Sequence, residues 1–246
     1  MYILLLLMIQ GNVFVQSDWS CGPDTSETVM QWTDTFLSSA SVEWLETPGE
    51  LTLSQFNSSS VTATSQLQGA ACIASYDFDT DGDIDLACSG FTGSKLVLLR
   101  NMGNGVWESS DIDIGIPGCC ATTAADINGD GHGDIVNAGE TTGVISWYQN
   151  DGTATSWTKR TISSGGGHPY CVQCDDFDND GDIDLAAAMY SAASIDVWWN
   201  MNGLGTSWNR TTLKSNFSGA WWLEIGDMDA DGDSDIAACS GTGSCI

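Results

Sequence analysis

Four acidic stretches of nine residues have the composition of a metal-binding loop. They read DFDTDGDID from Asp77, DINGDGHGD from Asp126, DFDNDGDID from Asp176 and DMDADGDSD from Asp227. Side-chain oxygens stand at positions 1, 3, 5 and 9, and glycine stands at position 6. Such oxygens converge when the chain coils tightly, because glycine permits the sharp turn and position 7 offers its backbone carbonyl. Hard oxygen ligands select calcium over zinc or copper, and magnesium is disfavoured because it gives up water reluctantly.

The sequence therefore predicts up to four Ca²⁺ ions with a structural role, each clamping the turn between two strands. The predicted ligand residues are Asp77, Asp79, Asp81, Asp83, Asp85, Asp126, Asn128, Asp130, His132, Asp134, Asp176, Asp178, Asp180, Asp182, Asp184, Asp227, Asp229, Asp231, Asp233 and Asp235. The second loop departs from the pattern at Asn128, His132 and Gly133, so we expect it to be the weakest site. Position 7 would use only its carbonyl, and we interpret the His132 imidazole as a bystander.

The residues around the loops repeat with the same period of about fifty residues. A short apolar run follows each loop, and an alternating segment then ends in asparagine at 101, 150 and 200. After a glycine turn, Trp107, Trp157 or Trp208 opens another strand. Small residues, such as Ala121–Ala125, lead into the next loop. Four short strands in about fifty residues are typical of a propeller blade. We therefore predict an all-β fold, a β-propeller of about four four-stranded blades, with tryptophans packed between the blades.

These loops, with the alternating segment before asparagine and the tryptophan after the glycine turn, resemble the FG-GAP/VCBS repeat family of calcium-binding β-propellers. The run Val144–Gly152 is especially similar to a blade of that family, and the resemblance covers residues 41–246. It implies that the calcium loop joins the first and second strands of a blade and that the first strand lies innermost. Members include the integrin α-subunit head, lectins and parts of polysaccharide-degrading proteins, so the resemblance implies fold and calcium more firmly than activity.

The number of blades leaves three arrangements open, because propellers of this family usually have seven blades and this chain holds about four. The segments 41–46 and 51–56 are predicted to be third and fourth strands, and 240–246 leads toward a third strand. These half-blades either close a four-bladed ring, belong to an incomplete piece of a longer propeller, or pair with other subunits. We favour the incomplete propeller. Residues 18–40 would form an N-terminal segment that includes part of a degenerate blade.

The charge of the chain excludes several classes of partner. Acidic residues number 33 and basic residues 6, for a net charge of −27. A surface this negative repels phosphate backbones and anionic lipids, so we expect no nucleic acid and no membrane insertion. The hydrophobic fraction of 42% and the eleven tryptophans argue against disorder. More than half of the acidic residues lie in the four loops.

The N-terminus predicts secretion. Residues 1–17 read as a signal peptide, with an apolar run at 3–9 and small residues before the expected cleavage after Ser17. The apolar run is shorter than the roughly 20 residues that span a bilayer. The nine cysteines and the sequons at Asn57, Asn209 and Asn216 agree with an extracellular, oxidising location.

The cysteines suggest several disulfides without defining their connectivity. We expect a cross-strand bridge between Cys72 and Cys88, and Cys21 with Cys245 would join the chain ends. Cys171 and Cys174 form a CxxC that we interpret as structural, because it lies on a predicted strand rather than at a helix N-terminus. The neighbours Cys119 and Cys120 either bridge one another or pair elsewhere. Nine is an odd number, so at least one thiol lacks an intramolecular partner.

The sequence favours binding over catalysis. It contains no nucleophile elbow, zinc-protease motif or phosphate-binding loop. We interpret His168 as an ordinary loop histidine, and calcium explains most of the paired carboxylates. The leading hypothesis is a secreted calcium-binding propeller, not an enzyme, that serves adhesion or recognition of a glycan or protein ligand. The alternatives are a structural subunit that self-assembles into a fibre or coat through open half-blades, and a fragment of a polysaccharide-degrading enzyme.

Overall fold

The computed structural model describes residues 6–9, 12–15, 36–37, 58–59 and 67–241, and the chain divides into two units, residues 1–62 and 63–246. In the first unit, short strands form two antiparallel pairs. These pairs are β1 (Leu6–Ile9) with β2 (Asn12–Val15), and β3 (Phe36–Leu37) with β4 (Ser58–Ser59). The strands predicted at 41–46 and 51–56 lie outside the described residues. The signal peptide at 1–17 stays a prediction.

The second unit is a series of antiparallel sheets, and three of them have four strands in chain order. Their strands are β5 (Ala70–Tyr76), β6 (Asp85–Gly90), β7 (Lys95–Asn101) and β8 (Trp107–Asp113) in blade 1; β9 (Cys119–Ala125), β10 (Asp134–Gly139), β11 (Val144–Asn150) and β12 (Trp157–Ser163) in blade 2; and β13 (Pro169–Asp175), β14 (Asp184–Met189), β15 (Ser194–Asn200) and β16 (Trp208–Lys214) in blade 3. Blade 4 comprises β17 (Ala220–Gly226) and β18 (Asp235–Ser240) within the described residues.

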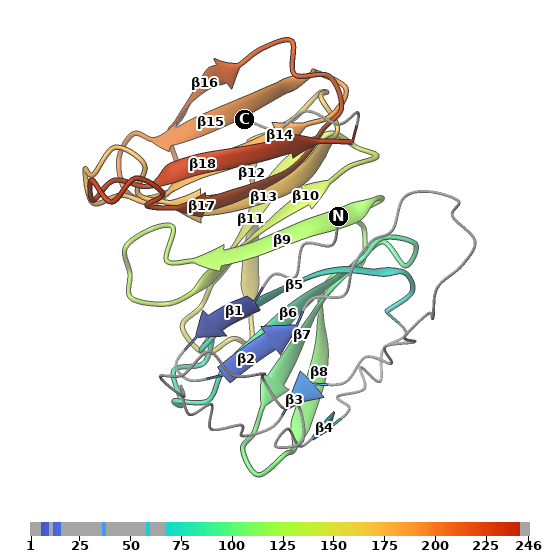
Figure 1. Cartoon of the computed structure of the whole chain (residues 1–246). Helices are drawn as coiled ribbons and strands as arrows, with labels where there is room; N and C mark the ends of the chain where they lie inside the picture. The colour runs from blue at the N-terminus through green and yellow to red at the C-terminus, as the bar shows by residue number, and fades with distance from the viewer. Residues whose placement is uncertain (1–5, 10–11, 16–35, 38–57, 60–66, 242–246) are drawn as a thin grey trace, which may run out of the picture. The chain divides into compact units, whose positions relative to one another are not determined.

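This architecture confirms the predicted all-β fold of four-stranded blades (Figure 1). The acidic loops join the first and second strands of all four blades, as the family resemblance implies. Three complete blades and two strands of a fourth lie within the described residues. The same part of the chain contains no helix that is long and apolar enough to cross a membrane.

Burial along the strands shows how the blades pack. The second strands β6, β10 and β14 are buried at every position, whereas the fourth strands β12 and β16 are largely exposed. Successive side chains of a strand point to opposite faces of the sheet, so a strand that is buried throughout must be covered on both faces. Blades 2 and 3 are therefore each covered on both faces by the neighbouring blades, and the polar fourth strand of each lies at the outer edge.

The blades meet along their first strands. β5 contacts β9, β9 contacts β13, and β13 contacts β17. These four strands therefore line the inner side of the second unit one after another (Figure 1), as expected for the innermost strand of a propeller. Small residues in β9, such as Ala121, permit this close approach.

Three apolar clusters fill the space between neighbouring blades. They include Phe78, Leu98 and Tyr148 between blades 1 and 2; Trp147, Leu185 and Trp198 between blades 2 and 3; and Val197, Phe217 and Leu223 between blades 3 and 4. Trp157 packs against the first cluster and Trp208 against the second, which confirms the predicted packing role of these tryptophans. Burying each such large side chain contributes about 1.5–3 kcal/mol.

The predicted bridge between Cys72 and Cys88 is wrong. Cys88 lies opposite Ile73 across the β5–β6 ladder, so Cys72 belongs to the other face of the sheet. Both residues carry free thiols. Cys72 Sγ lies 3.4 Å from the carbonyl oxygen of Thr122 in blade 2, so this thiol contributes to the contact between blades.

The cysteines of β9 and β13 also carry thiols. Cys171 and Cys174 lie three positions apart on β13, so their side chains point to opposite faces of the sheet. Cys119 directly precedes Cys120, which is the extra residue of a β-bulge in β9. All four thiols are free. Burial raises the pKa of Cys119 and of Cys120 to about 12, which keeps these thiols protonated and unreactive at neutral pH. Cys21 and Cys245 lie outside the described residues.

Candidate metal centre

Each acidic loop is folded around the carboxylate at its first position. In the first loop, Asp77 Oδ1 accepts a hydrogen bond from the Asp81 N–H at 3.1 Å, and Asp77 Oδ2 accepts one from the Gly82 N–H at 3.0 Å. The same two hydrogen bonds recur in the other three loops. The glycine at position 6 has φ between +89° and +98°, a backbone conformation that residues with a Cβ atom rarely adopt. The predicted role of this glycine is confirmed.

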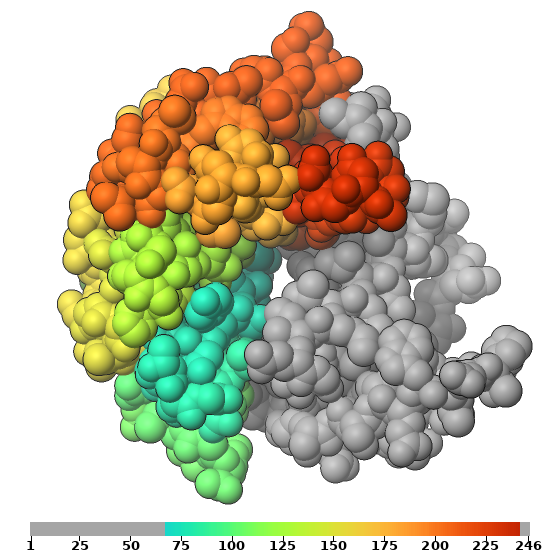
Figure 2. Space-filling model, turned by 90° about the vertical axis from the view of Figure 1, so that its left-hand side faces the viewer, coloured from blue at the N-terminus to red at the C-terminus, as the bar shows by residue number. Residues whose placement is uncertain are grey.

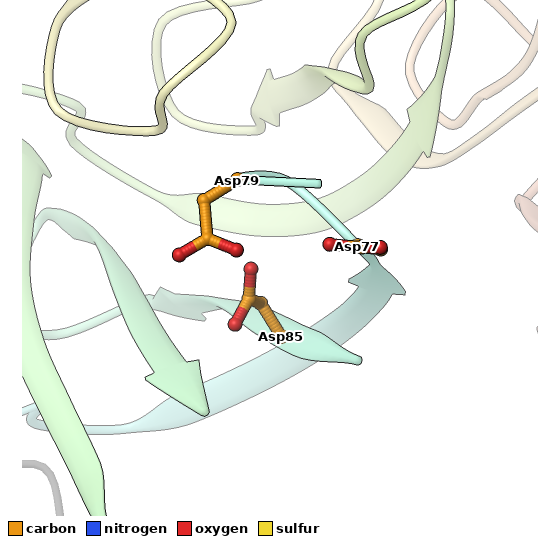
Figure 3. A group of neighbouring side chains, drawn as sticks. All are labelled: Asp77, Asp79 and Asp85. Carbon is orange, nitrogen blue, oxygen red and sulfur yellow. The ribbon is translucent and has the colours of Figure 1, made fainter. Parts of the chain in front are cut away.

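In three loops the carboxylates of positions 1, 3 and 9 converge, with one oxygen from each lying within 4.8 Å of the others. The three groups are Asp77, Asp79 and Asp85; Asp176, Asp178 and Asp184; and Asp227, Asp229 and Asp235. Figure 3 shows the first group, in which the carboxylates of Asp79 and Asp85 point toward one another. In Figure 2 the four acidic loops, coloured teal, lime, amber and red, lie on the face of the second unit that is turned toward the viewer.

The carboxylate at position 9 is held by two backbone donors. Asp85 Oδ1 accepts a hydrogen bond from the Asn101 N–H at 2.7 Å, and Asp85 Oδ2 accepts one from the Phe78 N–H at 3.1 Å. Burial, together with the neighbouring carboxylates, raises the pKa of Asp85 and of Asp184 to about 6 and that of Asp134 to about 7. Without a cation these carboxyl groups therefore resist ionisation, and a bound divalent cation would remove that cost.

The carboxylate of Asp184 is buried in the third loop. Asp184 is 2% exposed, and its Oδ2 atom has no hydrogen-bond partner of standard geometry. The Phe177 N–H, the counterpart of the donor at Phe78, forms a looser hydrogen bond with this carboxylate, which offsets part of the cost of burying its charge. Asp184 belongs to one of the groups of three converging carboxylates, so a cation bound there would offset the remaining cost. The donor set, hard oxygen atoms alone, fits calcium.

The side chains at the fifth and seventh positions are not among the three converging carboxylates of each group. Asp81 Oδ1 accepts a hydrogen bond from the Asp83 N–H at 2.9 Å, and the equivalent hydrogen bond recurs in each loop. The side chain at position 7 lies against a glycine between the third and fourth strands of the same blade. These pairs are Asp83 with Gly103, His132 with Gly152, and Asp182 with Gly203. All three glycines have a positive φ, which explains why glycine stands there, and a Cβ atom on any of them would also come within 3.1 Å of that side chain.

The second loop differs from the others in the way the sequence suggests. Asn128 Nδ2 donates a hydrogen bond to Asp130 Oδ2 at 2.8 Å, so the amide of Asn128 faces a carboxylate of its own loop. The pKa of Asp134 is raised to about 7, whereas the pKa values of Asp85 and Asp184 are raised to about 6. The imidazole of His132 lies beside Gly152, and its Nδ1 atom is buried without a hydrogen bond.

Comparison with known families identifies the repeat. A model of the FG-GAP-like repeat matches residues 77–136, 126–187 and 176–238, three overlapping segments that each run from one acidic loop to the strand after the next. The chain belongs to the FG-GAP-like repeat family. Each FG-GAP match therefore spans the contact between two consecutive blades, and the family that the sequence analysis expects is confirmed.

Comparison of the FG-GAP repeats with individual proteins adds a likeness in structure. No curated protein matches the chain. Among solved structures, a lectin from Agrocybe aegerita that specifically recognises non-reducing terminal N-acetylglucosamine is 18% identical, with a TM-score of 0.48. The alignment covers 70% of this chain and 47% of the lectin chain, so this chain spans about half the length of the lectin.

The asparagine at the end of each third strand is a structural residue of the FG-GAP blade whose role the sequence analysis missed. Asn150 Nδ2 donates hydrogen bonds to the Gly133 carbonyl at 3.0 Å and to the Phe78 carbonyl of blade 1 at 2.7 Å. Asn200 Nδ2 likewise donates to the Ile127 carbonyl of blade 2 at 2.9 Å. These amides tie the second and third acidic loops to the loop of the preceding blade. Their recurrence at residues 101, 150 and 200 was the available signal.

Proposed function

We propose that this protein is a secreted calcium-binding β-propeller that serves as an adhesion or recognition module for a glycan or protein ligand. The calcium ions have a structural role. The observation that carries the proposal is the convergence of carboxylates from positions 1, 3 and 9 in three of the four loops. Membership of the FG-GAP-like repeat family supports the same conclusion.

The side chains at positions 1, 3, 5 and 9 and the carbonyl at position 7 would hold each ion. A bound calcium ion would offset the repulsion among the carboxylates and fix the loop against the start of the second strand. Because the Asn150 and Asn200 amides connect consecutive loops, each ion would stabilise the contact between blades as well as its own turn. Calcium in this role supports the binding surface without contacting the ligand.

Binding rather than catalysis is favoured by the surroundings of the two histidines. His132 lies beside Gly152 at the edge of an acidic loop, and His168 Nδ1 lies 3.2 Å from Glu140 Oε1 in an exposed turn. Neither arrangement provides a general base next to a nucleophile. Exposed turns on a rigid scaffold are instead the usual place for ligand contacts.

The test of this proposal uses the full-length protein purified from the culture medium. We expect its N-terminus to begin at Asp18 after cleavage of the signal peptide, and equilibrium dialysis to detect several calcium ions per chain at millimolar calcium. The calcium-loaded protein should bind a member of a glycan array or a protein ligand, and EDTA should abolish that binding. Failure to bind calcium at millimolar concentration would contradict the proposal.

A further inference from the structure

Three aromatic side chains meet at the end of blades 3 and 4 that is opposite the acidic loops. The ring centroids of Tyr170 and Trp221 lie 4.5 Å apart, those of Tyr170 and Tyr190 lie 5.0 Å apart, and those of Tyr190 and Trp221 lie 6.0 Å apart. Tyr190 is 38% exposed and Trp221 is 36% exposed. We call these three residues the aromatic platform. A contiguous group of exposed aromatic rings on a folded surface usually marks a binding site.

Two β-bulges, one in β13 and one in β17, position two of the three rings. The ladder of β13 with β14 shifts between Pro169 and Cys171, and the ladder of β17 with β18 shifts between Ala220 and Trp222. Tyr170 and Trp221 are therefore the extra residues of two bulges, which re-aim a side chain out of the regular alternation. The equivalent bulge residues in β5 and β9 are Ala71 and Cys120. Every first strand thus has the bulge, but only blades 3 and 4 place an aromatic ring there.

Tyr190, the third residue of the platform, lies in a turn that backbone hydrogen bonds hold in place. Tyr190 follows β14 directly, and its N–H donates a hydrogen bond to the His168 carbonyl at 3.0 Å. The next N–H, that of Ser191, donates to the Gly167 carbonyl at 2.9 Å. These two bonds hold the turn after β14 against the segment that enters blade 3. The platform is therefore arranged before any ligand arrives, which lowers the entropic cost of binding.

Polar groups border the aromatic platform on the side of blade 2. Glu140 Oε1 lies 3.2 Å from His168 Nδ1, and Glu140 Oε2 accepts a hydrogen bond from the Thr141 hydroxyl at 3.0 Å. The Tyr170 hydroxyl also hydrogen-bonds to Glu140, and burial with the nearby carboxylate raises the pKa of Tyr170. An apolar surface with a few convergent polar groups at one side is the usual composition of a small-ligand site.

The arrangement of the rings and the charge of the protein together indicate which class of ligand the aromatic platform binds. The ring centroids lie 4.5–6.0 Å apart, so the rings contact one another and leave no space between them for a cation. The plane of Tyr190 is inclined by 76° to that of Trp221, so the two rings form a floor and a side wall. The net charge of −27 disfavours an anionic ligand. A pyranose ring has an apolar face that can lie flat on aromatic rings and hydroxyl groups at its edge that can hydrogen-bond to a carboxylate and an imidazole.

We propose that the aromatic platform is the binding site for a neutral glycan, whose pyranose ring stacks on Trp221 and contacts Tyr190 at its edge, and whose hydroxyl groups reach Glu140 and His168. This inference rests on the proposed recognition function and assigns a site and a ligand class to it. β13 runs from Tyr170 at the platform to the Asp176 loop, and a strand of this length spans roughly 20 Å. The glycan site and the calcium site of blade 3 are therefore separate, and each can be altered without the other.

The test compares platform variants with a matched control in the calcium-loaded, full-length protein. Phe91 follows β6 as Tyr190 follows β14, and it is 42% exposed but lies outside the platform. An array of neutral oligosaccharides, built from glucose, mannose, galactose and N-acetylglucosamine, serves as the probe. We expect Trp221→Ala and Tyr190→Ala to weaken glycan binding by about tenfold or more, the loss typical of truncating an aromatic anchor. Phe91→Ala should retain wild-type binding.

A second readout follows Trp221 in the wild-type protein, so the test does not depend on the folding of a variant. The bound oligosaccharide should protect Trp221 from oxidation by N-bromosuccinimide, as measured by mass spectrometry of the tryptic peptide. Melting temperatures with and without calcium show whether each variant keeps its fold.

The outcomes separate the platform from the proposed function. Glycan binding that survives both platform substitutions would overturn the platform and leave the recognition function standing. Calcium-dependent stability without binding to any neutral glycan would also overturn the platform, and would leave a protein as the ligand of the module. A melting temperature that calcium does not change would contradict the proposed function, whatever the array shows.

Discussion

At the scale of single residues, the aspartate at position 9 has two tasks. Asp85 accepts backbone hydrogen bonds that join the loop to the end of β7, and it also completes the group of three carboxylates. The sequence pattern predicted the second task, because a ninth-position oxygen is typical of the loop. The pattern did not predict the backbone hydrogen bonds. Their donors are the N–H groups of Phe78 and of Asn101, and only the folded sheet brings Asn101, on another strand, close to Asp85.

Substitution of one such aspartate should remove one ion. Asp184→Asn removes the charge of the buried carboxylate in the third loop and replaces one oxygen of the group of three carboxylates with an amide or an uncharged oxygen. We expect equilibrium dialysis to find one calcium ion fewer per chain. The control is Asp182→Asn, the same chemical change at position 7, where the side chain lies against Gly203 rather than among the carboxylates. Equal calcium stoichiometry in the two variants would contradict this assignment.

The asparagine amides give a second prediction at this scale. Asn150 is 3% exposed and donates to two buried carbonyl groups, one of them in the neighbouring blade. Asn150→Ala should lower the free energy of unfolding by about 2–4 kcal/mol, because it leaves buried carbonyl and N–H groups without partners. Urea denaturation measures the effect. The exposed Thr158→Ala on β12 should change stability by less than about 0.5 kcal/mol, and a similar loss in both variants would refute the role of Asn150.

At the scale of elements, the sequence predicted what depends on short-range spacing. The strands after each loop, the asparagine that ends β7, β11 and β15, and the tryptophan that opens β8, β12 and β16 are where the repeat places them. The failures arose from register. A shift of one residue places Cys72 and Cys88 on opposite faces, and the bulges that expose Tyr170 and Trp221 carry no composition signal of their own.

The loops also predict how pH acts on the metal-free protein. The pKa values of Asp85, Asp134 and Asp184 are raised to about 6–7, so the folded chain holds protons that the unfolded chain releases above pH 4. In EDTA, stability should therefore fall as the pH rises from about 4 to about 7. Carboxyl groups with a lowered pKa, those of Asp113 and Asp151, titrate below this range.

Calcium requires the ionised carboxylates, so its stabilising effect should grow over the same range. We expect the difference in melting temperature between calcium and EDTA to be larger at about pH 7.5 than at about pH 5. Differential scanning fluorimetry at the two pH values measures this difference. A metal-free protein whose melting temperature rises steadily from pH 4 to pH 7 would contradict the role assigned to the position-9 carboxyl groups.

At the scale of the whole molecule, the net charge of −27 follows largely from one repeated element. The loops place more than half of the acidic residues on one face of the second unit, and up to four calcium ions would bring the charge to about −19. The opposite ends of β13 and β17 carry the aromatic platform instead. Each blade thus places the proposed calcium site at one end of its first strand, and in blades 3 and 4 the proposed glycan site lies at the other end.

The central claim is that calcium in the acidic loops holds the blades together, and a thermal melt tests it most directly. The full-length protein is dialysed against EDTA, and its melting temperature is followed as calcium is added to millimolar concentration, with magnesium as the control. We expect a rise of several degrees or more with calcium, reversed by EDTA, and a much smaller rise with magnesium. A melting temperature that stays the same across the calcium titration would contradict the claim.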